Sequence, residues 1–342
     1  MGLALASLAA CSTDVELNAP FKERPVIYAA LDAAAPVQLV RVQRSFLTIN
    51  DPDANNIAKN RDSIYYRPGA IRVTMRPVNR ANGALLTPVV TLADTTIAKD
   101  TGLFAGGDQL VFRTPAGFRL DATRLYQIVV ERPNSELRVT ALTNVLPNLT
   151  DADILVPAVG VGGQRFLRGI NTNIRFNVRQ DSVRRYSVAV DMRIREVYGA
   201  GQGDSTVRFR NITWNPVIDR EPRGNLSGGQ VTVSYDAVGN DRFAFYDFLR
   251  TQLDTTDPNL LVRRFDQMTL RISTINNRLT QYISAVRDFN VLTQTRPFYT
   301  NVLGGVGVVG SRNISTFAVR PSAPDINTAM GTSRYAKLRF RP

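Results

Sequence analysis

Arginine is the residue type in this chain whose number and spacing most clearly suggest chemistry. The chain has 42 lysine and arginine residues against 29 acidic ones, a formal net charge of +13, and four of the 42 are lysine. Arginines recur two residues apart in β-type segments, as Arg193 and Arg195, Arg208 and Arg210, and Arg339 and Arg341. Side chains at this spacing lie on one face of a strand, and the guanidinium fork binds phosphate and carboxylate bidentately. We therefore predict six candidate anion-binding residues. The alternative is that the arginines are solvated and paired with the acids, in a chain from a genome that prefers arginine codons.

Composition excludes most catalytic and metal-binding chemistry. The chain has no histidine and one cysteine, which excludes a Ser-His-Asp triad, a Cys-His pair, a histidine-bound metal and a thiolate cluster. The aspartates fall near predicted turns and show no spacing typical of a calcium site or of a catalytic carboxylate pair. No basic motif interleaved with aromatic residues accompanies the pI of 10.3. We expect no enzyme, no cofactor, no metal and no nucleic-acid partner.

Gly305, Gly307 and Gly310 form a literal G-x-G-x-x-G, with Asp325 twenty residues after the first glycine. A dinucleotide site requires a strand before this motif and a helix directly after it. Here β-prone residues and Pro321 follow, so the sequence does not predict nucleotide binding. It indicates instead a bulge or a backbone with positive φ, where a loop and a sheet pack closely.

The first half of the chain has the pattern of an all-β domain. Turn signals about every ten residues predict an immunoglobulin-like antiparallel sandwich over residues 25–147. The strongest local signal is Asn79–Gly83, an Asn-Gly turn between two β-type runs, 71–78 and 85–92. Further strands are predicted at 25–32, 37–47, 109–114, 125–132 and 136–142.

The second half has a mixed pattern after a linker near residues 147–163. We predict an α+β domain over residues 164–342, with an antiparallel sheet and two amphipathic helices at 240–253 and 277–289. Its predicted strands are 173–178, 186–197, 206–214, 230–235, 267–273 and 335–341. The fold class expected for the whole chain is mainly β.

The single cysteine follows a short uncharged segment. Leu8-Ala9-Ala10-Cys11 resembles the lipobox of bacterial lipoproteins, in which the thiol accepts diacylglycerol. This resemblance implies a signal peptide at 1–10, possibly truncated at its start, a tether at 11–24 and a lipid anchor at Cys11. Asp14 and Glu16 resemble the surface-export signal of Bacteroidota lipoproteins. The alternative is a buried free cysteine.

Two further segments, 294–312 and 54–66, resemble an uncharacterised family of outer-membrane, surface lipoproteins of Bacteroidota. The matching positions are Pro297, Tyr299, Thr300, Asn301, Gly305, Gly307, Ser311 and Arg312. No reaction is attached to that family, so the resemblance implies a location and a class of protein but no catalytic residue.

These observations predict a lipid-anchored outer-membrane lipoprotein, facing the cell surface or the periplasm. Its expected role is non-catalytic, as an accessory subunit of an outer-membrane protein assembly or as a surface binding module. Lipopolysaccharide and acidic glycans are the anions expected near such a protein. Two alternatives remain open: a carboxylate-dependent hydrolase of envelope glycans, and an adhesin that binds anionic polymer through arginine-rich strand faces.

Overall fold

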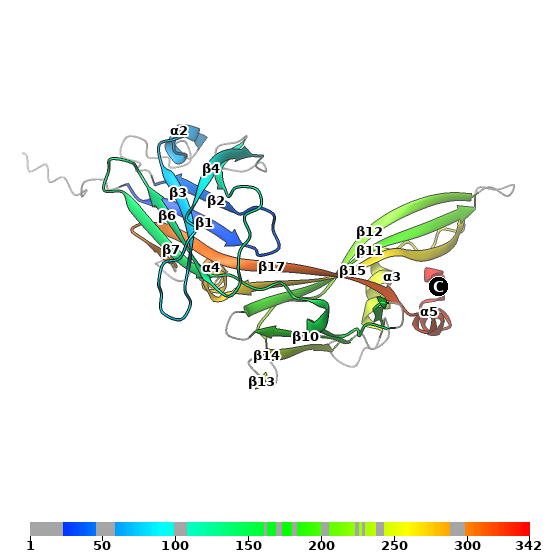
Figure 1. Ribbon diagram of the computed structural model, residues 1–342. Coiled ribbons are helices and arrows are strands. Elements are labelled where there is room, and N and C mark those ends of the chain that lie inside the picture. Colours follow the sequence, from blue (N-terminus) through cyan, green and yellow to red (C-terminus); the bar gives the residue numbers. More distant parts are fainter. Residues whose placement is uncertain are drawn as a thin grey trace, which may run out of the picture.

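The protein is mainly β, as the sequence predicts, and strands from both halves of the chain join in one large sheet (Figure 1). The computed structural model describes residues 23–45, 59–98, 108–160, 163–168, 173–179, 183–199, 205–222, 226–227, 230–236, 243–287 and 298–342. Within those residues, thirteen strands form one sheet and four form a second.

Seven strands from the first half of the chain form the N-terminal lobe. They are β1 (Pro25–Leu31), β2 (Leu39–Arg44), β3 (Arg72–Val78), β4 (Val90–Ile97), β5 (Gln109–Arg113), β6 (Leu125–Glu131) and β7 (Arg138–Asn144). Their order in the sheet is β1-β2-β5-β4-β3-β6-β7, with antiparallel neighbours throughout. Alternate residues such as Ile27 and Val73 are fully buried, which is the pattern of strands with one face on a core. A short helix, α2 (Arg61–Ile64), lies beside β2.

The predicted Asn79–Gly83 turn is confirmed. Gly83 has φ +71° and donates its N–H to the carbonyl of Asn79. The second strand of this hairpin begins later than predicted, since Leu85 forms only an isolated bridge with Val78 and β4 starts at Val90.

Four long strands from the second half form the main sheet of the C-terminal lobe. They are β11 (Val183–Gly199), β12 (Ser205–Arg220), β15 (Leu260–Asn276) and β17 (Val306–Pro321), in the order β12-β11-β15-β17. A smaller sheet, β13-β14-β10-β8, contains β13 (Leu226–Ser227), β14 (Gln230–Asp236), β10 (Asn173–Arg179) and β8 (Ile154–Val156). Helices α3 (Ala244–Gln252) and α5 (Ala323–Met330) contribute to the core of this lobe. Trp214 packs there edge-to-face on Phe245, with ring centroids 5.2 Å apart.

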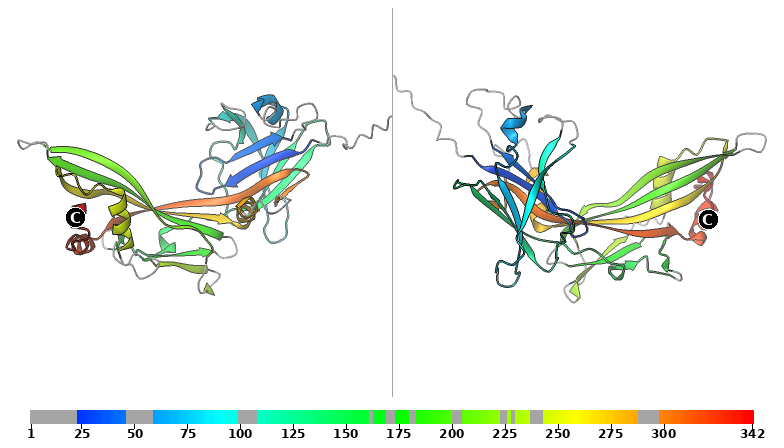
Figure 2. Two further views of the ribbon diagram at one scale, coloured as in Figure 1. Left: turned by 180° about the vertical axis from the view of Figure 1, so that it is seen from behind. Right: turned by 45° about the horizontal axis from the view of Figure 1, so that its top comes forward.

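Strand β17 belongs to both lobes (Figures 1 and 2). Its first part, Val306–Ser311, pairs in parallel with β1, and its later part, Arg312–Val319, pairs antiparallel with β15. The short strand β16 (Val302–Leu303) pairs with β7, and Val302 and Val309 enter the core of the N-terminal lobe. The sandwich predicted over residues 25–147 is therefore completed by residues from the far end of the chain.

A buried polar cluster fixes the chain between the lobes. Ser311 Oγ accepts a hydrogen bond from the N–H of Leu146 (2.9 Å), and Ser315 Oγ accepts one from the N–H of Leu149 (3.0 Å). Nearby, Asn313 Nδ2 donates to Asn148 Oδ1 at 2.6 Å. Ser311 and Asn313 are fully buried, so these bonds satisfy polar groups that water does not reach.

The glycine-rich segment is a close-packing element, as the sequence indicates. Gly307 has φ +114°, and a Cβ there would lie 2.1 Å from the carbonyl oxygen of Ile27 in β1. A Cβ at Gly310 would lie 2.5 Å from Leu279 Cγ in helix α4 (Asn277–Arg287), which packs against β17. These glycines allow β1 and α4 to approach β17.

The strand predicted at residues 335–341 is wrong. Ala336–Leu338 form a 3-10 turn, Arg339 is left-handed with φ +56°, and Phe340 alone forms a parallel bridge, to Arg263. The turn buries Tyr335, Leu338 and Phe340 together, which the alternating pattern of a strand would not do.

Helices α3 and α4 confirm the two predicted amphipathic helices, although α3 begins at Ala244 and the predicted cap, Asn240, lies outside the described residues. None of the helices in the described parts of the chain is long and apolar enough to cross a membrane.

Candidate anion-binding site

The register of β11 and β12 decides where four of the predicted arginines lie. Arg193 is opposite Asn211, and Arg210 is opposite Ile194. Residues opposite each other share a face of the sheet, so Arg193 and Arg195 lie on one face and Arg208 and Arg210 on the other. Each pair shares a face as predicted, but the two pairs do not form a joint surface.

Three of these four arginines have partners. Arg193 Nε lies 3.3 Å from Asp266 Oδ2, and its guanidinium carbon lies 4.1 Å from the ring centre of Phe209. On the other face, Arg210 Nε lies 3.5 Å from Glu196 Oε2. Arg208 lies there too, 4.9 Å from the ring centre of Tyr198. The alternative interpretation, that the arginines pair with acids, therefore holds for Arg193 and Arg210, whereas Arg208 lies against an aromatic ring.

Arg195 belongs to a different arrangement, a row of three arginines across neighbouring strands. It is the register partner of Arg264 in β15. Phe340 is in turn the parallel partner of Arg263, which places Arg341 beside Arg264. Neighbouring strands lie about 4.8 Å apart, so the backbones of three arginines follow one another at that spacing across the sheet. We call Arg195, Arg264 and Arg341 the arginine row.

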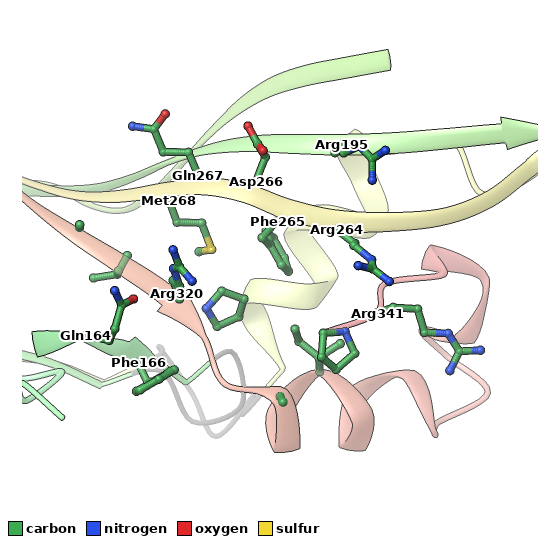
Figure 3. A pocket seen from close by; sticks show the side chains of 16 residues that line it. Gln164, Phe166, Arg195, Arg264, Phe265, Asp266, Gln267, Met268, Arg320 and Arg341 are labelled. Atoms are coloured by element: carbon green, nitrogen blue, oxygen red, sulfur yellow. The ribbon is translucent and has the colours of Figure 1, made fainter. Parts of the chain in front are cut away.

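The arginine row borders a pocket of about 600 Å³. The pocket forms where β15 and β17 separate, because their pairing extends only to Met268 and Val319. Arg320 enters it from the end of β17, and Gln164 and Phe166 enter it from the segment that contains β9 (Phe166–Leu167). Figure 3 shows Gln164, Phe166 and Arg320 toward one side of this pocket and Arg264 and Arg341 toward the other.

The arginines of the pocket have no acidic side-chain partner among the described residues. Arg195, Arg264, Arg320 and Arg341 make no side-chain hydrogen bond or ion pair with any residue that the structure describes. Among the described residues that line the pocket, Asp266 alone has a carboxylate side chain, and Arg193 already pairs with it. Like charges directly opposite on neighbouring strands destabilise a sheet. An anion bound across the row would remove that repulsion.

A buried ion pair holds the row in place. Arg263, which is 0% exposed, donates from Nε to Glu196 Oε1 (2.8 Å) and from its other nitrogens to the carbonyls of Leu338 (3.2 Å) and Asp254 (2.7 Å). Its backbone also bonds the segment that carries Arg341, since Arg341 donates its N–H to the Arg263 carbonyl (2.9 Å). Arg263 thus fixes both the strand of Arg264 and the segment of Arg341.

The carboxylate of this pair has a further partner, because Tyr198 donates its hydroxyl proton to Glu196 Oε2 at 3.1 Å. Burial raises the pKa of Tyr198, and the nearby Glu196 carboxylate raises it further. The phenol therefore stays protonated and available to donate.

A second buried arginine holds the other side of the pocket. Arg165, 3% exposed, makes five hydrogen bonds from its guanidinium group: to the side chain and carbonyl of Asp151 and to the carbonyls of Ile154 and Pro157. Gln164 and Phe166 flank it in the sequence, and their side chains line the pocket. The buried arginine thus fixes the backbone that presents those two residues.

The remaining predicted site residues have other positions. Arg339 turns the chain with its left-handed backbone and does not line the pocket. Of the family-motif residues, Asn301 exchanges two hydrogen bonds with the backbone of Val309, and Ser311 Oγ donates to the carbonyl of Leu31 (2.7 Å). Thr300 Oγ1 accepts from the N–H of Val302 (3.1 Å).

The motif therefore closes the N-terminal lobe. A Cβ at Gly305 would lie 2.6 Å from the carbonyl of Pro25, Tyr299 lines a small groove beside α4, and Arg312 is exposed on β17. Pro297, Cys11, Asp14 and Glu16 lie outside the described residues.

Two arginines of the site, Arg264 and Arg320, are not predicted from the sequence, and neither are Gln164 and Phe166. The signal used was an arginine two residues away in the same strand, and neither Arg264 nor Arg320 has one. Their significance comes from neighbours on other strands, which only the register of the sheet reveals. Arg195 and Arg341 were predicted, although Arg341 reaches the site through a turn rather than through the expected strand.

No protein-family model and no curated protein matches this chain. Among solved structures, the C-terminal globular domain of an oligosaccharyltransferase from Pyrococcus abyssi is similar over 88% of this chain, with 9% sequence identity and a TM-score of 0.25. The matched region covers 50% of the length of that structure.

Proposed function

We propose that this protein is a non-catalytic binding module that holds a multiply charged anion in the pocket beside the arginine row. The observation that carries the proposal is the run of Arg195, Arg264 and Arg341 across neighbouring strands without an acidic partner among the described residues. Such a run weakens the sheet in the absence of a ligand, and Arg320 adds a fourth guanidinium across the pocket.

The chemistry of arginine narrows the ligand class. Four guanidinium groups offer planar, permanently charged forks that match phosphate and carboxylate oxygens, and this favours a ligand with several such groups. The pocket is open, with exposed Arg264, Arg320 and Arg341, so a polymer can pass through it without being enclosed.

The glycan hydrolase remains a weaker alternative at this pocket. Hydrolysis by two carboxylates needs a pair of them on opposite sides of a sugar bond. In the described part of this lining, Asp266 has the one carboxylate side chain, and it pairs with Arg193. No group of three or more metal-ligand residue types occurs within the described residues either.

Binding of inorganic polyphosphate and of poly-L-glutamate tests the proposal. We expect both polymers to bind at low salt and to dissociate steeply as salt rises. Arg264→Gln and Arg341→Gln should each weaken binding roughly tenfold, because each removes one charge-assisted contact. Arg208→Gln, on the opposite face of the same sheet, is the matched control and should bind like the unmodified protein. Equal binding by all three variants would refute the proposed site.

We also propose that the protein is attached to an outer membrane through a lipid on Cys11. The support is the Leu8-Ala9-Ala10-Cys11 sequence, together with the acidic residues Asp14 and Glu16 that follow it. Metabolic labelling with palmitate in a host that processes lipoproteins tests this directly. Label should be present on the unmodified chain and absent from Cys11→Ala, and label that persists in the variant would contradict the anchor.

A further inference from the structure

An exposed aromatic ring lies beside Arg320, one of the pocket arginines that have no side-chain partner among the described residues. Phe166 is 45% exposed, and it is the register partner of Arg320 in a parallel pair, so the two side chains lie on the same face. Single exposed apolar residues are common on protein surfaces and carry no meaning by themselves. Phe166 differs because five hydrogen bonds hold the guanidinium group of the adjacent Arg165. These bonds fix the backbone from which the Phe166 ring extends.

The surroundings of the ring offer both apolar and polar contacts. The backbone of Gly160 packs against it, since a Cβ on that glycine would lie 3.6 Å from two of the ring carbons. Pro321 and Pro342 add apolar surface to the same pocket. The side-chain amide of Gln164 forms no hydrogen bond within the described part of the chain, so it can both donate to and accept from a ligand.

We propose that the multiply charged ligand is a linear acidic glycan. One sugar ring would place its apolar C–H face on Phe166, with its hydroxyl groups near Gln164. Acid groups on that ring and on later ones would meet Arg320 and then the arginine row on the other side of the pocket. This inference rests on the proposed function and adds the requirement for a sugar to it.

Other anions use the pocket less completely. A single phosphate or sulfate would reach one part of the arginine set and leave Phe166 and Gln164 without contact. Single-stranded nucleic acid binds proteins through several aromatic rings that stack successive bases. The described lining of this pocket has two aromatic rings, Phe166 and Phe265, and the ring of Phe265 already stacks on Phe340 with centroids 4.4 Å apart. A single sugar ring needs only one aromatic ring to stack on and hydrogen-bonding groups beside it, and Phe166 and Gln164 supply these.

Two polymers with the same charged group separate the sugar from the charge. Polygalacturonate and poly-L-glutamate both carry carboxylates, but only the first has sugar rings. We expect Phe166→Ala to weaken the binding of polygalacturonate about three- to tenfold and to leave the binding of poly-L-glutamate unchanged. Arg264→Gln should weaken the binding of both. Fully methyl-esterified polygalacturonate, which lacks the charge, should not bind measurably.

The controls distinguish failure of this inference from failure of the proposed function. Phe209→Ala removes another exposed aromatic ring on the same face of the sheet, one that Arg193 covers, and should change neither binding constant. If Phe166→Ala weakens the binding of both polymers equally, or of neither, the inference that the ligand is a glycan is refuted, while the proposed anion-binding site is not. Binding of oligo-dT tighter than that of polygalacturonate at equal salt would assign the site to nucleic acid and overturn the inference. If Arg264→Gln has no effect on any polymer, both proposals fail.

Discussion

Two arginine-rich pockets lie at opposite ends of this molecule, and they handle charge differently. The one at the β6–β7 turn of the N-terminal lobe has a volume of about 390 Å³ and contains Arg72, Arg132 and Arg138. Arg138 pairs there with Glu131, and Arg132 forms two hydrogen bonds of 3.0 Å with the carboxylate of Glu23. In the C-terminal pocket, the four arginines of the lining have no such partners among the described residues.

The difference shows that the number of arginines is a poor guide to function in this chain. Several arginines elsewhere in the described residues, such as Arg124, Arg185 and Arg271, form ion pairs with nearby carboxylates, as expected if the arginines are solvated and paired with acids. The C-terminal pocket departs from that pattern because four arginines meet there and the one nearby aspartate is already engaged. The uncompensated charge, rather than the net charge of +13, marks the candidate site.

The largest expected effect comes from the buried ion pair beneath the C-terminal pocket. Arg263→Ala leaves Glu196 buried without its main partner and removes the bonds to Leu338 and Asp254. We expect a loss of about 3–5 kcal/mol in the free energy of unfolding, measured by urea denaturation. Arg264→Ala changes the next residue along the chain and should not destabilise the protein. Equal losses of unfolding free energy in the two variants would show that the buried Arg263 contributes no more to stability than the exposed Arg264.

A smaller effect, of opposite sign in the two pockets, is expected from removing exposed arginines. Arg264→Gln relieves repulsion in the row and should stabilise the ligand-free protein by about 0.2–1 kcal/mol at low salt. Arg138→Gln removes a compensated charge and should destabilise the ligand-free protein slightly, by less than about 1 kcal/mol. Thermal unfolding in low and high salt measures both, and the stabilisation should diminish as salt rises. A destabilised Arg264→Gln would mean that an unrecognised partner compensates this arginine.

The smallest effect concerns a compensated arginine outside both pockets. The hydrogen bond from Arg271 lowers the pKa of Asp191, and the same contact raises the pKa of Arg271. The pKa of Asp191 is therefore lower in the folded protein than in the unfolded chain, where it is about 3.9. The pair contributes its full stability at pH values above about 3.9, and this contribution is lost as the pH falls through the folded-state pKa. Asp191→Asn should therefore be closer to the unmodified protein in stability at low pH than at pH 7. Both groups are partly exposed, so the difference is expected to be small. An equal difference at both pH values would contradict the assigned shift.

Local signals in the sequence were sufficient for most of the elements but not for the site. The Asn79–Gly83 turn, the two amphipathic helices and the close packing at Gly307 each follow from residues adjacent in the chain. The C-terminal strand prediction failed because alternation in residues 335–341 could not reveal that Tyr335, Leu338 and Phe340 turn together into the core. Arg264 and Arg320 gain their importance from residues that are far away in the sequence and adjacent in the sheet.

The parallel pairing of β1 with β17 has a consequence for how the chain acquires its structure. Ser311 reaches back 280 residues to the carbonyl of Leu31. During synthesis, the strands of the N-terminal lobe emerge first, but the edge of β1 has no β17 to cover it until β17 (Val306–Pro321) has itself been made. An open edge strand is a site of mispairing and aggregation. We therefore expect fragments that end before Val306 to aggregate, and the full chain to depend during its synthesis on whatever shields β1.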